Sequence, residues 1–127
     1  MKTFELHLTV TQEHLDENQH VNNVRYLEWV QEISRAHWEA LAPMEVQEKV
    51  FWVVRSHQLT YKKEAVLGDE LLLKTYVKSF KGPFSIRIVE VYREDVLIHQ
   101  SESNWCLIDR TTMKPAKLAA EFVSLFI

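Results

Sequence analysis

The chain has 127 residues, 46% hydrophobic and 26% charged, a composition that is ordinary for a soluble globular protein and predicts one domain, residues 1–127. The net charge of −3 and the lack of a basic tract argue against nucleic acid as a partner. One cysteine, Cys106, excludes an intrachain disulfide and suits the cytoplasm, and no apolar run is long enough to make the membrane a partner.

Apolar and polar side chains alternate from Phe4 to Val10, which is the period of a half-buried strand. This start therefore predicts a strand and not a signal peptide. A polar loop follows over residues 11–21, and Asn22 or Asn23 is the expected N-cap of a helix. The predicted helix runs to the vicinity of Pro43, for about twenty residues and about 30 Å. The residues that recur at helical spacing are Leu27, Val30, Ile33, His37, Trp38 and Leu41.

Four further strands are predicted after the helix, with turns at residues 68–69, 81–83 and 94–95 between them. Their predicted ranges are 51–62, 71–80, 84–93 and 96–109. In the strand 84–93 the alternation shifts phase between Ile88 and Val89, which favours a bulge there. The strand 96–109 contains Cys106, which we expect to be a small buried apolar residue.

The last segment, residues 117–127, fits a short helix with Leu118, Phe122 and Leu125 turned inward. The order β-α-β-β-β-β with one dominant helix predicts an α+β fold, in which a five-stranded antiparallel sheet wraps around the helix. Such a sheet leaves an edge strand open, and a second copy could pair with it. We therefore expect a homodimer or a dimer of dimers.

The loop before the helix concentrates polar side chains at the positive end of the helix dipole, among them Asp16, Asn18 and His20. A carboxylate beside free helix N–H groups, here near residues 22–24, has the parts for acyl hydrolysis. Residues 11–21 contain no serine or cysteine, so Asp16 would either activate a water molecule or attack the carbonyl itself.

The same residues also have simpler interpretations. A loop aspartate is usually a turn residue, and a loop histidine often only bonds the backbone. A metal site made of His14, Asp16 and His20 is conceivable by residue type, but the sequence offers no cluster that would supply a fourth ligand. We therefore expect neither a metal nor another cofactor.

The run from Asp16 to Tyr26 resembles the signature of the hotdog-fold thioesterases. It is similar to the 4-hydroxybenzoyl-CoA thioesterase-like branch and, more closely, to the plant and bacterial acyl-ACP thioesterases. A second stretch, from Leu59 to Glu64 and then from Gly68 to Leu71, resembles the strand and turn after the helix in that family. The resemblance spans residues 4–109 and implies a single hotdog domain.

The resemblance implies that Asp16 is the catalytic carboxylate, as general base or nucleophile, and that Asn18 and His20 orient the reacting groups. Glu64 matches a glutamate in an Arg-Arg-Glu-Cys-like segment of the acyl-ACP branch. Ala65 stands where that cysteine would be, which rules out a cysteine nucleophile at this position. The expected substrate-binding residues are Asn22, Asn23, Val24 and Tyr26.

We therefore expect a thioesterase of fatty acid metabolism that hydrolyses acyl-CoA or acyl-ACP to free acid and thiol. Acyl-ACP thioesterases are usually tandems of two hotdogs, so a homodimer would be the substitute here. The alternatives are a non-catalytic acyl-CoA binding or sensing domain and a hotdog hydratase or dehydratase. The Asp-x-Asn-x-His set at 16–20 favours the hydrolase, because a binding domain would not need it and it fits a dehydratase poorly.

Overall fold

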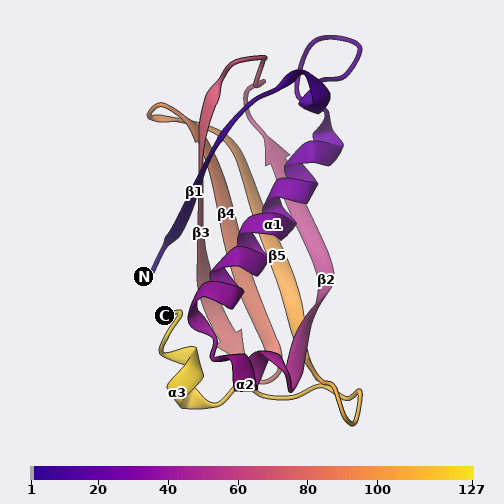
Figure 1. The fold of residues 1–127 in the computed structure, drawn as a ribbon, viewed down its shortest axis with the longest axis vertical. Coiled ribbons are helices and arrows are strands. Elements are labelled where there is room, and N and C mark those ends of the chain that lie inside the picture. Colours follow the sequence, from indigo (N-terminus) through magenta and orange to yellow (C-terminus); the bar gives the residue numbers. More distant parts are fainter. Residues whose placement is uncertain (1) are drawn as a thin grey trace.

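The computed structural model describes residues 2–127, in which five antiparallel strands form one sheet around the long helix α1, Asn23–Leu41 (Figure 1). The strands are β1 (Phe4–Thr9), β2 (Val50–Tyr61), β3 (Glu70–Lys81), β4 (Phe84–Arg93) and β5 (Val96–Asp109). The short helical segments are η1 (Gln12–His14), α2 (Met44–Gln47) and α3 (Ala120–Val123). The predicted α+β layout is confirmed, and each predicted strand agrees with the observed one within one residue at either end.

The strands lie in the order β1-β3-β4-β5-β2, so the edges of the described sheet are β1 and β2. The β2 edge is twelve residues long, and Val53 on it is 43% exposed. An exposed edge of this length presents unpaired backbone groups and is a surface that another strand can extend.

Helix α1 begins at an asparagine cap, because the side chain of Asn22 accepts a hydrogen bond from the N–H of Val24 at 3.0 Å. It ends two residues before Pro43, which has no backbone N–H to continue the helical bonding. No helix among residues 2–127 is both long enough and apolar enough to cross a membrane. One stripe of the helix is buried, at positions three or four residues apart: Tyr26, Trp29, Val30, Ile33, Ser34 and His37.

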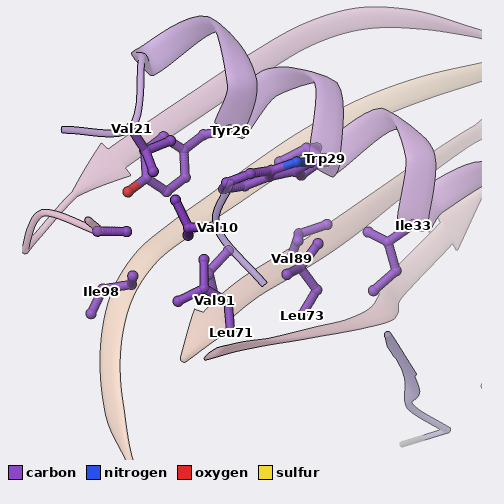
Figure 2. Packing of buried hydrophobic residues seen from close by; sticks show 12 residues of the cluster. Val10, Val21, Tyr26, Trp29, Ile33, Leu71, Leu73, Val89, Val91 and Ile98 are labelled. Carbon is purple, nitrogen blue, oxygen red and sulfur yellow. The ribbon is translucent and has the colours of Figure 1, made fainter. Parts of the chain in front are cut away.

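The apolar core lies between this stripe and the concave face of the sheet (Figure 2). Trp29 and Ile33 point from α1 toward Leu73 on β3 and toward Val89 and Val91 on β4. The helix packs mainly on β1, β3 and β4. The concave side of β2 and β5 is therefore less covered by α1, which leaves room beside the helix.

The bulge predicted in β4 between Ile88 and Val89 is wrong, because the pairing with β3 continues there without a shift. Both residues are buried, at 5% and 0% exposure, on opposite faces of the strand. The shift in the sequence pattern thus reflects two buried faces and no extra residue. The observed register shifts lie at Val54–Ser56 on β2, at Val77–Ser79 on β3 and opposite Val91–Tyr92 on β5.

The predicted C-terminal helix is present but is only the single turn α3, Ala120–Val123. Leu118 is buried as expected, whereas Phe122 and Leu125 are only half-buried. The residue that goes inward is Phe126, which is 1% exposed and stacks on Trp38 with ring centroids 5.6 Å apart. This contact fixes the C-terminal segment beside the second half of α1.

Candidate active site

The loop before α1 is folded around the carboxylate of Asp16. Its Oδ1 accepts hydrogen bonds from the backbone N–H of Asn18 at 2.8 Å and of His20 at 3.3 Å. The backbone N–H of Asp16 donates to the carbonyl of His20 at 2.9 Å, and Gln19 takes a left-handed φ of 63° to close this turn. Among residues 2–127, Oδ2 of Asp16 has no hydrogen-bond partner. One oxygen therefore holds the loop, and the other can face a substrate or water.

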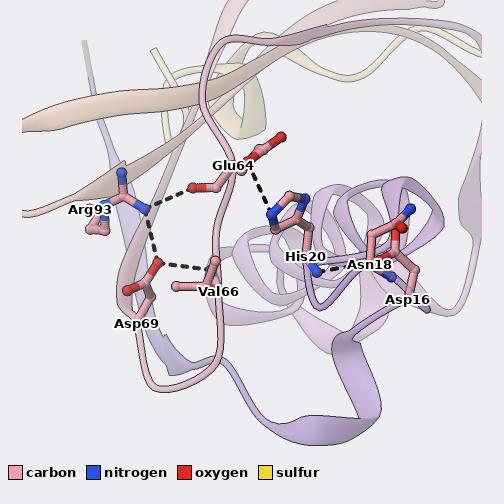
Figure 3. A network of polar contacts seen from close by, with 7 residues as sticks. All are labelled: Asp16, Asn18, His20, Glu64, Val66, Asp69 and Arg93. Carbon is pink, nitrogen blue, oxygen red and sulfur yellow. Dashed lines mark hydrogen bonds and ion pairs between the residues drawn. The ribbon is translucent and has the colours of Figure 1, made fainter.

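The structure brings Glu64, from the segment after β2, to this loop. Its Oε2 lies 3.2 Å from Nε2 of His20, while the backbone N–H of His20 points to Asp16 (Figure 3). The side chain of Glu64 is 69% exposed and that of His20 is 41% exposed, so this pair is open to solvent. The backbone N–H of Val21 also donates to the carbonyl of Ala65 at 3.0 Å, which ties the two segments together.

A second polar network holds the segment that carries Glu64. Arg93, at the end of β4, donates from Nη1 to the carbonyl of Glu64 at 2.7 Å and to Oδ2 of Asp69 at 2.9 Å (Figure 3). The same carboxylate oxygen accepts the N–H of Val66 at 3.0 Å. Asp69 and Arg93 therefore fix the backbone of the segment that carries Glu64. In the sequence Asp69 is recognisable only as a turn residue, and no local signal marks Arg93.

The first turn of α1 presents few free donors. The N–H of Asn22 bonds the carbonyl of His14 at 2.9 Å, and the N–H of Val24 bonds the side chain of Asn22. Of the N–H groups of residues 22–24, that of Asn23 is the one without a partner in the described chain. Of the residues 22–24, which were expected to supply an oxyanion donor, Asn23 is therefore the one whose N–H group is free to do so within the described residues.

Tyr26 does not lie on the surface with Asp16. It is 3% exposed, stacks on His99 with ring centroids 4.7 Å apart and meets Trp29 edge-on. Burial raises the pKa of its hydroxyl. Tyr26 is therefore a core residue. Val24, which also lies in the first turn of α1, is 59% exposed.

The site is an open surface on this chain. Asn18 and Glu64 are exposed and Asp16 is half-buried. Within residues 2–127, no three His, Cys, Asp or Glu side chains are grouped closely enough to hold a metal ion. A cavity of about 500 Å³ lies beside α1, but its lining includes none of the predicted site residues.

Residues 1–126 match the family model of the acyl-ACP thioesterase N-terminal domain. The chain is 29% identical over 115 residues to the long-chain acyl-CoA thioesterase FadM of Escherichia coli K12, covering 85% of each protein. It superposes on YbaW, a probable thioesterase from Escherichia coli, with a TM-score of 0.81 and 26% identity, covering 95% of this chain and 94% of that one. It also superposes on SAV2348 from Staphylococcus aureus, which was solved in complex with CoA. The TM-score is 0.86 and the identity 20%, covering 98% of this chain and 81% of that one. The resemblance to hotdog-fold thioesterases is therefore confirmed: the chain belongs to the acyl-ACP thioesterase N-terminal domain family and is a thioesterase.

Proposed function

We propose that the protein hydrolyses acyl-CoA or acyl-ACP thioesters to free acid and thiol at Asp16. The observation that carries this proposal is the arrangement of the Asp16 carboxylate, with one oxygen bound by two backbone N–H groups and the other without a partner in the described chain. It lies in the loop that leads into α1, where the N–H of Asn23 is also without a partner. A carboxylate and an oxyanion donor are the groups that acyl transfer to water needs.

The free oxygen of Asp16 can act in two ways. As a general base it takes a proton from a water molecule, whose oxygen bonds to the thioester carbon. As a nucleophile it bonds to that carbon itself and forms an anhydride that water then opens. In both cases the carbonyl oxygen gains negative charge, which the N–H of Asn23 stabilises, and the C–S bond breaks as the thiolate leaves. Because a thiolate is a good leaving group, little acid assistance is needed.

His20 and Glu64 act as an orienting pair in this proposal. We expect Glu64→Ala to lower kcat/KM measurably but by no more than about fivefold, because an exposed pair contributes up to about 1 kcal/mol. Release of thiol from acyl-CoA, followed with a thiol-reactive dye, measures the change. Glu17→Ala, which removes an exposed carboxylate from the same loop, is the matched control. An unchanged kcat/KM for Glu64→Ala would remove Glu64 from the site.

A second copy of the chain would close the open site, and we propose a homodimer or a dimer of dimers. The twelve-residue β2 edge supports this, since it can pair with its own copy. Light scattering should give a solution mass of two or four times 15.1 kDa. The mass of a single chain at micromolar concentration would contradict the proposal.

We place the acyl chain beside α1 on its β2 side. Tyr26, an expected substrate-binding residue, is buried in the core, whereas Trp52 lines the cavity. Acyl-CoA and acyl-ACP panels of increasing chain length, assayed by thiol release, test the substrate class. Binding without release of thiol would favour the alternative of an acyl-CoA binding domain over the hydrolase.

A further inference from the structure

Arg87 is a buried cation that has no countercharge among residues 2–127. It lies on β4, facing α1, and is 7% exposed. Its Nη1 donates to Nδ1 of His37 at 2.9 Å and to Oγ1 of Thr75 at 3.1 Å. Neither partner is charged at pH 7. Thr75 has a neutral hydroxyl, and the pKa of His37 is lowered to about 4 by burial and by the nearby charge of Arg87. Among residues 2–127, no carboxylate forms an ion pair with Arg87.

Two nitrogens of the guanidinium, Nε and Nη2, have no hydrogen-bond partner in the described chain. Burial lowers the pKa of Arg87 to about 10, so the group still carries its charge at pH 7. A guanidinium can only donate, and a free pair of its N–H groups matches the two oxygens of a carboxylate. A buried charge without a partner is unfavourable in a folded chain, which is why such groups often mark functional sites.

Arg87 lines the cavity of about 500 Å³ beside α1, a volume typical of ligand sites. The charged residues that line this cavity are three arginines and one glutamate, so positive charge is in excess. Trp105, on β5, lines the same cavity, and its indole N–H is buried and without a partner among residues 2–127. The aromatic part of the lining is formed by Trp38, Phe51, Trp52, Phe80, Trp105 and Phe126.

These features select a ligand that is anionic, accepts hydrogen bonds and carries an apolar body. We propose that the cavity binds an organic carboxylate, with its two oxygens on Nε and Nη2 of Arg87 and its hydrocarbon part against the aromatic lining. Such a carboxylate has two possible sources. One is a free fatty acid, and the other is the far end of an acyl chain whose thioester lies at Asp16, which rests on the proposed function. His37, beside Arg87, lies fourteen residues after Asn23, or about 21 Å along α1.

The first test measures binding without turnover. Isothermal titration with decanoate and with its uncharged analogue decanamide should show that the wild type binds decanoate at least about tenfold more tightly. Arg87→Met removes the charge while filling most of the same volume, and it should bind both ligands alike. Arg55→Met is the matched control: Arg55 lies on the outer face over the ring of Phe84, and its loss should leave the preference intact.

Two results would overturn the proposal: a wild type that binds decanoate no better than decanamide, or an Arg87→Met protein that keeps the preference. The first result needs no variant, so the proposal stays testable even if Arg87→Met does not fold. Failure of thioester hydrolysis leaves this binding measurement unaffected, so the two proposals fail separately.

The second test separates the two sources. The wild type is assayed with a long acyl-CoA and with the same acyl-CoA carrying a terminal carboxylate. A kcat/KM about tenfold higher for the carboxylated substrate, lost in Arg87→Met, assigns the carboxylate to the acyl chain. No preference between the substrates, together with competitive inhibition by decanoate in the wild type alone, assigns it to a free fatty acid.

Discussion

Asp16→Asn is expected to lower thioester hydrolysis by about a hundredfold or more while leaving the fold intact. The asparagine side chain keeps an oxygen at Oδ1, which can still accept the N–H groups of Asn18 and His20. It loses the free carboxylate oxygen, and an amide can neither take a proton from water nor attack the thioester. The substitution therefore removes the chemistry of Asp16 and keeps its turn. Steady-state kinetics with an acyl-CoA and a thiol-reactive dye measure the loss in kcat.

Asp16→Ala removes both functions of the carboxylate, so it should lose the same activity and also loosen the loop. Circular dichroism and urea unfolding on both variants show whether the fold is kept. Glu17→Gln, the same chemical change at the exposed neighbouring residue, serves as the control and should turn over like the wild type. Undiminished turnover by Asp16→Ala would show that hydrolysis does not depend on this carboxylate.

The loop around Asp16 was predictable because its signals are local. Turn residues, an asparagine cap and the start of an apolar stripe all lie within a few positions of one another. The support for Glu64 was not predictable in this way. Arg93 reaches Glu64 and Asp69 across 29 and 24 residues, and only the pairing of β3 with β4 brings them together.

In strand β4 the hydrophobic pattern of the sequence does not identify the face that lies toward α1. The alternation of Phe84, Ile86 and Ile88 looks like a core-facing pattern, yet the side facing α1 carries Ser85 and Arg87. The structure allows this because the helix covers the sheet unevenly, and the polar side chains lie at a cavity instead of in packed hydrocarbon. A pattern of hydrophobicity assigns residues to faces only where each face has one environment. Because the pattern assigned Ile86 and Ile88 to the core face, it led to the wrong prediction of a bulge and gave no sign that Arg87 is buried.

The protein is expected to lose stability as the pH falls from about 6.5 to about 4, because two histidines are buried in their neutral form. Burial lowers the pKa of both His37 and His99 from 6.5 to about 4. Between these values the unfolded chain binds protons that the folded chain does not, so acid favours unfolding. At pH 4.5 the two groups together should reduce the free energy of unfolding by about 5 kcal/mol relative to pH 7. That is a large part of the stability of an ordinary domain, about 5–15 kcal/mol.

His99→Phe isolates one of these groups. His99 is 0% exposed, and neither of its ring nitrogens has a hydrogen-bond partner in the described chain, so phenylalanine removes no bond and can keep the stacking on Tyr26. Urea unfolding at pH 7 and pH 4.5 should show about half of the wild-type loss. His7→Gln, at an exposed position on β1, is the control and should keep the full loss. An equal loss in His99→Phe and the wild type would mean that acid unfolding is driven by other groups, because a phenylalanine has no proton to bind in either state.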